Sequence, residues 1–308
     1  MRRTESRDIL LEMKVLVTGA AGRLGSCVCH ILYEAGIEFL AVDKVAGEGT
    51  AYPVEVVDLL DWQACVDLIV GVDVLAHFAN LANWNSGKPE EVYNENVQMN
   101  MNLFQAAANA DCKRIVFASS VQVLDGQLPI ADRVQHPIFL PYIPLDSDMP
   151  AIPRNSYGLS KQAAENALEY FSETAGMSCV AIRYPLLVDS QMLKAAIEGG
   201  GMYRGNCYDG FTYLPVYSAA EAAVKAMTAK LVGFHCYFVA SKDNLEQRPA
   251  LEIIEKELSH LPCHKPLDDM DSLVDCSKVS AELGWEQPRS MAESFEKYGK
   301  LEPLRPYE

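Results

Sequence analysis

The sequence predicts an α/β protein in which one parallel β-sheet is covered by helices on both faces. From Lys14 to Arg183, short apolar runs alternate with helical patterns, which is typical of a parallel sheet. A glycine-rich turn, 18–25, directly follows the first apolar run. Several runs end at a small or polar residue, and the carboxyl ends of parallel strands form a ligand-binding crevice. These observations together predict a doubly wound sheet with a binding site along one edge.

The expected elements follow from local apolar patterns and from the residues that interrupt them. A β-branched run indicates the first strand, and the apolar residues after the glycine turn recur at helical spacing until Gly36. The next two strands end at Asp43 and Asp58. Across the alternating region we expect strands at 14–18, 38–42, 54–57, 72–78, 114–119 and 178–183, and helices at 24–35, 62–70, 89–110 and 157–175.

Two later stretches interrupt the alternation. Residues 126–153 combine prolines with an apolar run, so we expect a segment without regular structure that packs across the crevice as a lid. Residues 191–213 contain a run of glycines and are followed by a strand and a helix over 213–229. We therefore predict a Rossmann-type main domain and a small substrate-binding lobe. The main domain covers 13–190 and is rejoined by 212–240, and the lobe is made of 191–211 and 241–308.

The composition is that of an ordinary globular protein with an excess of acidic groups. Hydrophobic residues make up 49% of the chain and charged residues 22%, which is enough to bury a full core without a long biased segment. The formal net charge of -16 opposes nonspecific attraction to nucleic acid and to anionic membrane surfaces. We therefore expect a small molecule as the ligand, and neither nucleic acid nor membrane as a partner.

The amino-terminal sequence predicts neither export nor membrane insertion. Its apolar run, 9–11, is too short for a signal peptide or a membrane span, so we expect a cytoplasmic protein. Met13 directly precedes the first strand, so the preceding residues form a flexible leader or reflect the choice of start between Met1 and Met13.

The cysteines and histidines suggest no metal centre. Nine cysteines, an odd number scattered through apolar stretches, indicate reduced thiols in the core. His260, Cys263 and His264 lie close together in sequence, but no paired Cys-x-x-Cys accompanies them. We therefore predict a surface turn there, without a metal ion.

The glycine-rich turn predicts a dinucleotide site. Gly19, Gly22 and Gly25 let the backbone turn tightly and approach a pyrophosphate, which then rests on amides at the amino end of the next helix. Asp43 lies eighteen residues after Gly25 at a strand end, where a carboxylate binds a ribose 2′-hydroxyl. This carboxylate repels the 2′-phosphate of NADP, so NAD is expected, although Arg23 can offset part of the repulsion. The alternative is a glycine-rich connection without a ligand.

A Tyr-x-x-x-Lys pair, Tyr157 and Lys161, indicates proton-transfer chemistry. Residues four apart on a helix share one face, so the ammonium can lie beside the phenol and lower its pKa toward neutrality. A phenolate of this kind takes a proton from a sugar or alcohol hydroxyl. The spacing alone arises in many helices, but Ser119 and Ser120 at a strand end and the glycine turn favour a redox site. The alternative for the serines is a hydrogen-bonding pair that closes the strand.

Taken together, these motifs resemble the extended short-chain dehydrogenase/reductases, and in particular the NAD-dependent epimerase/dehydratase family. The resemblance covers nearly the whole chain, from Val15 to about Tyr298. Its motifs, in combination, are highly specific to the family. The matching segments are 18–25, 58–59, 77–79, Asn96, 117–123, 157–161, 182–184 and 283–285.

The resemblance implies a role for each of the motif residues. It implies that Asp58 lies by the adenine and that Ala79 lies near the cofactor ribose. It implies that Tyr157 is the acid/base and that Lys161 holds the nicotinamide ribose. Ser120 would hydrogen-bond the reacting oxygen.

Ser119 and Ser120 lie next to each other at the end of an expected strand, and only one of them is expected to be catalytic. Ser120 is preferred to Ser119 because Val123 lies three residues beyond it, as in the Ser/Thr-x-x-Val pattern of the family. Asn96 is expected to make a structural contact between helix and sheet. The expected catalytic residues are Ser120, Tyr157 and Lys161, and the expected cofactor-binding residues are Gly19, Gly22, Arg23, Leu24, Gly25, Asp43, Asp58, Leu59, Ala79, Tyr157 and Lys161.

Two departures from the family pattern bear on the substrate. Dehydratases of the family carry an Asp-Glu pair directly after the catalytic Ser or Thr, but Val121 and Gln122 stand there, which argues against loss of water. Many nucleotide-sugar epimerases have an Asn three residues after the strand arginine, whereas Arg183 is followed at that distance by Leu186. The case for a UDP-sugar is weakened accordingly. The compact length and residues 117–120 are similar to uronate dehydrogenases, which oxidise a free sugar acid with NAD.

The sequence therefore predicts an NAD-dependent sugar oxidoreductase that acts on a sugar or a sugar nucleotide. An epimerase would return the hydride, and a uronate-dehydrogenase-like enzyme would release NADH. A non-enzymatic NAD-binding regulator is the remaining alternative, and the intact Ser120, Tyr157 and Lys161 argue against it.

The resemblance also suggests a homodimer. Members of the family pair the two long helices that correspond to 89–110 and 157–175. The first helix carries several apolar residues that suit such a surface, although packing on the chain's own sheet explains them equally well. These residues are Met99, Met101, Leu103 and Phe104.

Overall fold

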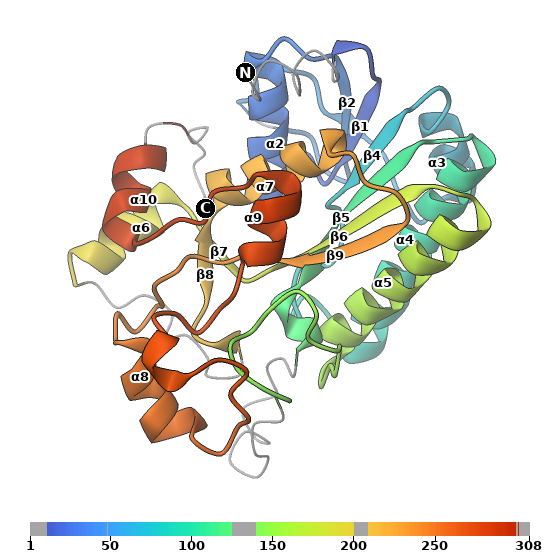
Figure 1. Cartoon of the computed structure of the whole chain (residues 1–308). Helices are drawn as coiled ribbons and strands as arrows, with labels where there is room; N and C mark the ends of the chain where they lie inside the picture. The colour runs from blue at the N-terminus through green and yellow to red at the C-terminus, as the bar shows by residue number, and fades with distance from the viewer. Residues whose placement is uncertain (1–10, 48, 125–139, 200–208, 300, 302–308) are drawn as a thin grey trace.

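A seven-stranded sheet organises the computed structural model, which describes residues 11–47, 49–124, 140–199, 209–299 and 301. The strand order is β3-β2-β1-β4-β5-β6-β9, and each neighbouring pair runs parallel (Figure 1). This order confirms the predicted α/β class. The strands are β1 (Val15–Thr18), β2 (Phe39–Asp43), β3 (Glu55–Val56), β4 (Val74–His77), β5 (Arg114–Ser120), β6 (Ser178–Tyr184) and β9 (Phe234–Phe238).

Helices cover both faces of this sheet (Figure 1). On one face lie α3 (Trp62–Leu68), α4 (Pro89–Asn109) and α5 (Ser156–Thr174), with α4 packed along α5. On the other face α2 (Arg23–Glu34) packs against α7 (Val216–Thr228), and α9 (Ser277–Leu283) packs on α7. The doubly wound arrangement predicted from the alternating pattern is therefore confirmed.

Alternation within the strands supplies two separate cores, one on each face of the sheet. Val15 and Val116 belong to the cluster that contains α2 and α7. Leu16 and Ile115, their neighbours along the strands, belong to the cluster that contains α3, α4 and α5. Successive side chains of a strand point to opposite faces, so strands buried on both faces are apolar throughout.

A smaller second sheet lies beside the main one. It pairs β7 (Leu186–Val188) with β8 (Tyr213–Pro215), and α6 (Ser190–Ile197) packs against α10 (Met291–Tyr298) next to it. A small apolar cluster of Val188, Leu193, Tyr213 and Met291 holds these elements together. Within 212–240, β9 and α7 return to the main sheet, whereas β8 joins the second one. The division into two lobes stays a prediction.

Residues 140–149 connect the main sheet to the carboxyl-terminal part of the chain. The Ile143 amide donates to Pro262 O at 2.9 Å, and the Leu145 amide donates to Leu273 O at 2.9 Å. Both apolar side chains are fully buried. These bonds attach the described part of 126–153 to the carboxyl-terminal part of the chain, and residues 140–149 are called the tether below. The rest of the predicted lid, up to residue 139, lies outside the described residues.

Three further observations concern a membrane span, a metal site and the thiols. In the described ranges, no helix is long and apolar enough to cross a membrane, and no group of three His, Cys, Asp or Glu side chains could hold a metal ion. His264 instead stacks on Tyr142, with 3.9 Å between the ring centroids. The cysteines in the same ranges are free thiols.

Two of the residues suggested for a dimer surface have another use. Leu103 and Phe104 are fully buried in the chain's own core. Met101, by contrast, is 40% exposed on α4. Packing on the sheet therefore explains part of the apolar pattern of α4.

Candidate active site

The glycine-rich turn between β1 and α2 has the shape that a pyrophosphate requires. Gly19 has a φ of 69°, and a Cβ there would lie 2.6 Å from the Ala79 amide nitrogen. A Cβ on Gly25 would overlap the carbonyl oxygen of Gly19. Helix α2 begins without a side-chain cap at Gly22, so its first-turn amides are directed at the turn. The turn therefore fits the diphosphate of a dinucleotide.

The other residues expected around the cofactor gather along the same edge of the sheet. Asp43 ends β2 and accepts a hydrogen bond from the Ala21 amide at 2.8 Å, so its carboxylate lies against the glycine turn. Ala79 follows β4, and its amide donates to Thr18 Oγ1 at 3.4 Å. The convergence that the strand ends predicted is observed for these residues.

The remaining expected residues differ in how closely they approach the turn. Asp58 is exposed beyond the short edge strand β3, and Leu59 next to it is buried. Arg23 Nη1 donates to Leu187 O at 3.2 Å and so reaches from the glycine turn to β7 of the second sheet. Arg23 therefore links the two parts of the molecule, a contact that the sequence did not indicate.

Ser120, Tyr157 and Lys161 come together where β5 meets α5. Ser120 is the last residue of β5, and its side chain is close enough to Tyr157, near the start of α5, to affect the pKa of the phenol. The Lys161 Nζ lies 5.4 Å from the centroid of the Tyr157 ring and donates to Ala118 O at 2.8 Å. All three side chains are buried. The sequence thus identified three residues that the fold brings into one cluster.

The pKa values in this cluster differ from the expectation. Burial raises the pKa of Tyr157 to about 12, although its hydrogen bond with Ser120 acts in the opposite direction. Burial also lowers the pKa of Lys161 to about 7, against the field of the Glu165 carboxylate. The prediction that Lys161 brings the phenol toward neutrality is therefore wrong for this structure, because burial disfavours the charged phenolate. At neutral pH Tyr157 keeps its proton.

A buried ion pair supports the cluster from behind. Glu165 and Arg183 form two hydrogen bonds, from Nε to Oε1 at 2.9 Å and from Nη2 to Oε2 at 2.7 Å. Ser119 donates to Glu165 Oε1 at 2.5 Å, so this serine is committed to the pair while Ser120 faces Tyr157. Glu165 follows Lys161 by four residues on the same helix face, a spacing from which the sequence could have identified it.

Asn96 makes structural contacts with another helix and a loop, where a contact between helix and sheet was expected. Its Oδ1 accepts from the Leu81 amide at 2.7 Å, and its Nδ2 donates to Ser160 Oγ at 3.1 Å. The side chain is fully buried. Asn96 therefore ties α4 to α5 and to the loop that follows β4.

A test of the glycine turn compares two alanine variants. Gly25→Ala is expected to lower both stability and NAD affinity, because its Cβ overlaps the backbone of Gly19 and forces α2 away from β1. Gly22→Ala is the matched control for folding, since its Cβ would lie 3.2 Å from Gly19 O and its φ of -77° suits alanine. It should melt close to the wild type and still bind NAD more weakly, because the methyl group approaches the diphosphate. Thermal melting and NAD titration check both, and a Gly25→Ala protein of unchanged stability would contradict the packing argument.

His77 predicts a loss of stability in acid. Burial lowers its pKa to about 3, so the folded state keeps the ring neutral while the unfolded state takes up a proton below about pH 6.5. Stability from this group is therefore complete above that pH and is lost as the pH falls toward 3, by up to about 1.4 kcal/mol per pH unit. Urea unfolding between pH 7 and 5 measures the slope. His77→Gln should flatten it, whereas the exposed His260→Gln should not, and equal slopes in all three proteins would contradict the prediction.

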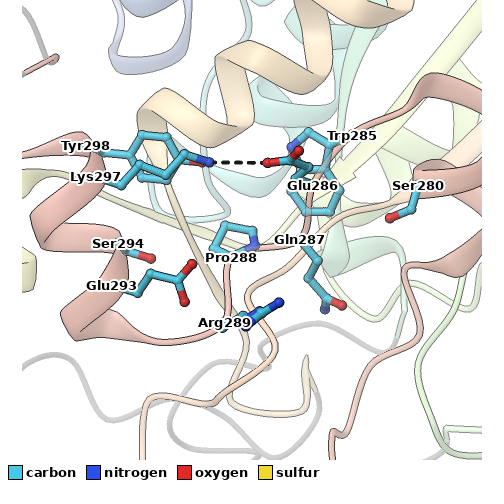
Figure 2. Close-up of a pocket in the computed structure, with 10 residues that line it drawn as sticks. All are labelled: Ser280, Trp285, Glu286, Gln287, Pro288, Arg289, Glu293, Ser294, Lys297 and Tyr298. Carbon is cyan, nitrogen blue, oxygen red and sulfur yellow. Dashed lines mark ion pairs between the residues drawn. The ribbon is translucent and has the colours of Figure 1, made fainter.

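A separate cavity of about 620 Å³ lies near the carboxyl-terminal helices (Figure 2). Its lining consists of Ser280, Trp285, Glu286, Gln287, Pro288, Arg289, Glu293, Ser294, Lys297 and Tyr298. Lys297 and Glu286 approach each other within 3.8 Å at its rim, as the dashed line in Figure 2 shows. None of its lining residues belongs to the cluster around Tyr157.

The fold and the sheet edge together define a class of protein. A turn that fits a dinucleotide, followed along the same edge by serine, tyrosine and lysine, is the arrangement of an NAD-dependent oxidoreductase of the short-chain dehydrogenase/reductase type. A family model described as the NAD dependent epimerase/dehydratase family matches residues 15–189. The chain therefore belongs to this family, and NAD is its cofactor.

Individual relatives carry different activities. UDP-glucose 4-epimerase of Corynebacterium glutamicum is 23% identical over 310 residues, which cover 89% of this chain and 90% of that protein. A uronate dehydrogenase of Pseudomonas syringae pv. tomato is 29% identical over 174 residues, which cover 55% of this chain and 58% of that protein. A solved short-chain dehydrogenase/reductase superfamily protein of Agrobacterium tumefaciens, with bound NAD, has a TM-score of 0.68 at 22% identity, over 94% of this chain and 96% of that chain.

Proposed function

We propose that this enzyme oxidises a hydroxyl group of a sugar, with hydride transfer to NAD and proton transfer through Tyr157. The observation that carries the proposal is the burial of Ser120, Tyr157 and Lys161 in one cluster, with Lys161 Nζ 5.4 Å from the centroid of the Tyr157 ring and the glycine turn along the same sheet edge. Ser120 would hold the reacting oxygen, and Lys161 would hold the nicotinamide ribose. NAD, when bound, supplies the hydride acceptor.

The cofactor would lie along the strand ends from β3 to β5. The turn amides around Gly22 would hold the diphosphate, and Asp43 would accept a hydrogen bond from the adenosine ribose. Asp58 and Leu59 would lie by the adenine. The exposed Asp58 and the buried Leu59 suit a polar edge and an apolar face of that ring.

The protonation state of Tyr157 bears on the direction of the reaction. A phenol with a pKa of about 12 is a proton donor at neutral pH, which suits the half-reaction in which a ketone is reduced to an alcohol. For the oxidation, Tyr157 must first give up its own proton. An epimerase uses both half-reactions in turn, and the similarity to a UDP-glucose 4-epimerase over most of the chain supports a sugar epimerase as the leading form of the proposal.

Oxidation of a free sugar acid with release of NADH is the second form. It is supported by the similarity to a uronate dehydrogenase and by the residues after Arg183, where Leu186 begins β7. A dehydratase is disfavoured, since Val121 is apolar and Gln122 Oε1 accepts from Asn155 Nδ2 at 3.0 Å. Neither side chain supplies the acid and base that loss of water requires.

The experiment mixes purified protein and NAD with a panel of free aldoses, uronates and nucleotide sugars. Nicotinamide absorbance reports net oxidation, and chromatography of the sugars reports epimerisation. NADH release that requires Tyr157 would establish the dehydrogenase, and a changed sugar without net NADH would establish the epimerase. If NAD binds but no compound in the panel reacts, the proposal fails in favour of a non-enzymatic NAD-binding regulator.

We place the enzyme in the cytoplasm and expect it to form a homodimer through α4 and α5. Partly exposed apolar side chains on these helices support the pairing. Met101 is 40% exposed, Leu159 is 46% exposed and Tyr170 is 54% exposed. Sedimentation of the wild type and of Leu159→Lys tests the assembly, and a wild-type monomer at micromolar concentration would rule it out.

A further inference from the structure

A row of buried polar side chains connects Lys161 to the first strand. Lys161 Nζ donates to Asn80 Oδ1 at 2.6 Å, and Asn80 Nδ2 donates to Asn100 Oδ1 at 3.0 Å. The same Asn100 oxygen lies 2.9 Å from His77 Nε2, and His77 Nδ1 lies 2.6 Å from Thr18 Oγ1. The side chains come from α5, the loop after β4, α4, β4 and β1. The row therefore crosses the sheet beneath the ends of the strands.

The chemistry of Lys161 permits one direction along this row. In its charged form Lys161 has three donors and no acceptor, so the atom of Asn80 that faces it is the oxygen, as the structure has it. The amide nitrogen of Asn80 then donates to the oxygen of Asn100. Because that oxygen only accepts, His77 must carry its proton on Nε2, and its Nδ1 must accept the hydroxyl proton of Thr18.

The orientation of the Asn100 amide leaves one of its own polar groups unpaired. In the described structure, Asn100 Nδ2 is buried and has no hydrogen-bond partner. Turning the amide over would point its nitrogen at the nitrogen of Asn80, so that two donors would face each other. The unpaired nitrogen costs free energy. The orientation persists because Lys161 orients the Asn80 amide, which in turn donates to the oxygen of Asn100.

Asn80 is well placed to control Lys161. It is adjacent to Ala79, and its side chain supplies one of two acceptors for Nζ, the other being Ala118 O at 2.8 Å. One acceptor comes from the loop after β4 and the other from β5, the strand that pairs with β4. They hold Nζ 4.6 Å from the centroid of the Phe117 ring.

We infer that Asn80 is the positioning residue for Lys161, and that it transmits the donor polarity of Lys161 to His77 so that this ring stays the Nε2–H tautomer. The inference rests on the proposed role of Lys161 toward the nicotinamide ribose and adds to it the residue that holds the lysine. Asn80 acts through Lys161 and takes no part in the chemistry itself.

The test separates two roles of the Asn80 amide, whose oxygen accepts from Lys161 and whose nitrogen donates to Asn100. Asn80→Ala removes both the acceptor for Lys161 and the donor for Asn100. Asn80→Asp keeps the acceptor and removes the donor. Asn83→Ala, at an exposed position in the same loop, is the matched control. Nitrogen NMR of histidine-labelled protein reports the tautomer of His77, which His77→Gln identifies in the spectrum, and NAD titration reports the positioning of Lys161.

The wild type should show His77 as the Nε2–H tautomer. Asn80→Ala should lose this single-tautomer signal and bind NAD about tenfold more weakly, as expected for loss of a hydrogen bond to a charged group. Asn80→Asp should lose the tautomer signal and keep the NAD affinity, and Asn83→Ala should change neither. If Asn80→Ala does not fold, Asn80→Asp and the wild type still decide the question of polarity.

Three results would overturn the inference. A wild-type His77 protonated on Nδ1, or an unchanged Nε2–H signal in Asn80→Asp, would show that polarity does not pass through Asn80. Unchanged NAD affinity in folded Asn80→Ala would show that Asn80 does not position Lys161. Both measurements are independent of turnover, so they remain decisive if the sugar panel gives no reaction and the proposed function fails.

Discussion

Tyr157→Phe is expected to lower turnover by about 10²- to 10⁴-fold, the range that general acid–base catalysis contributes. The substitution removes only the phenolic hydroxyl group. The ring itself remains to fill its buried site and to pack near Lys161. NAD affinity and melting temperature should therefore stay close to those of the wild type. Product formation at saturating sugar, together with NAD titration, measures the effect.

Tyr170→Phe is the matched control for this variant. It lies on the same helix, α5, but is 54% exposed and belongs to no part of the site. It should turn over like the wild type. If Tyr157→Phe keeps a rate within a few fold of the control, the proton is transferred by another group and the assignment of Tyr157 is incorrect.

Arg183→Met is expected to destabilise the protein by about 3–5 kcal/mol, the cost of leaving a buried charge without its partner. The side chains of Arg183 and Glu165 are 6% and 7% exposed, and their closest charged atoms are 2.7 Å apart. Arg183 Nη1 also donates to Met149 O at 2.6 Å, so the substitution removes a contact with the tether. Urea unfolding measures the change.

Two further variants separate the charge effect from a general loss of packing. The double variant Glu165→Leu with Arg183→Met should recover much of the loss, because apolar side chains of similar volume often replace a buried pair without cost. Arg248→Met breaks pairs with Glu252 and Glu257 at the surface and should change stability little. A single Arg183→Met variant as stable as Arg248→Met would indicate that water reaches Glu165 in the folded protein.

The strands and helices of the main sheet could be predicted from sequence because their signals are local. Apolar runs bounded by Gly36 or by Asp43 identified β1, α2 and β2 to within a residue or two. The strand predicted at 54–57 is shorter, because β3 is an edge strand in which only Glu55 and Val56 pair with β2. Edge pairing depends on a neighbour, which a local pattern does not report.

The second sheet was not predicted, for the opposite reason. A strand was expected at the start of 213–229, where β8 lies, but β7 and its pairing with β8 were not expected, because each strand has three residues and more than twenty residues separate them along the chain. Helix α6 runs into 191–213, a stretch expected to interrupt the alternation, and Asp189 caps it by accepting from the Met192 amide at 2.8 Å. Asp189 followed by apolar residues such as Leu193 is a pattern that indicates the start of a helix. The glycine run that follows drew attention away from it.

The identities of the site residues were predictable, but their electrostatics were not. Tyr157 and Lys161 share a helix face, so four-residue spacing sufficed to pair them. Their pKa values depend on burial, which is set by the elements packed around them. The contact of Lys161 with Asn80 joins residues 81 positions apart and requires β4 and α5 to be placed in space first.

Asp43 gives the choice of cofactor a structural consequence. Its carboxylate accepts from the Ala21 amide, so the side chain that we propose for the adenosine ribose also braces the turn that receives the diphosphate. Exchanging Asp43 for a residue compatible with a 2′-phosphate would withdraw that brace at the same time. Selectivity between the two cofactors and affinity for the cofactor therefore depend on the same side chain. An enzyme of this lineage that came to prefer NADP would need a second substitution near Ala21, and a library varied at position 43 alone would return weak binders of both cofactors.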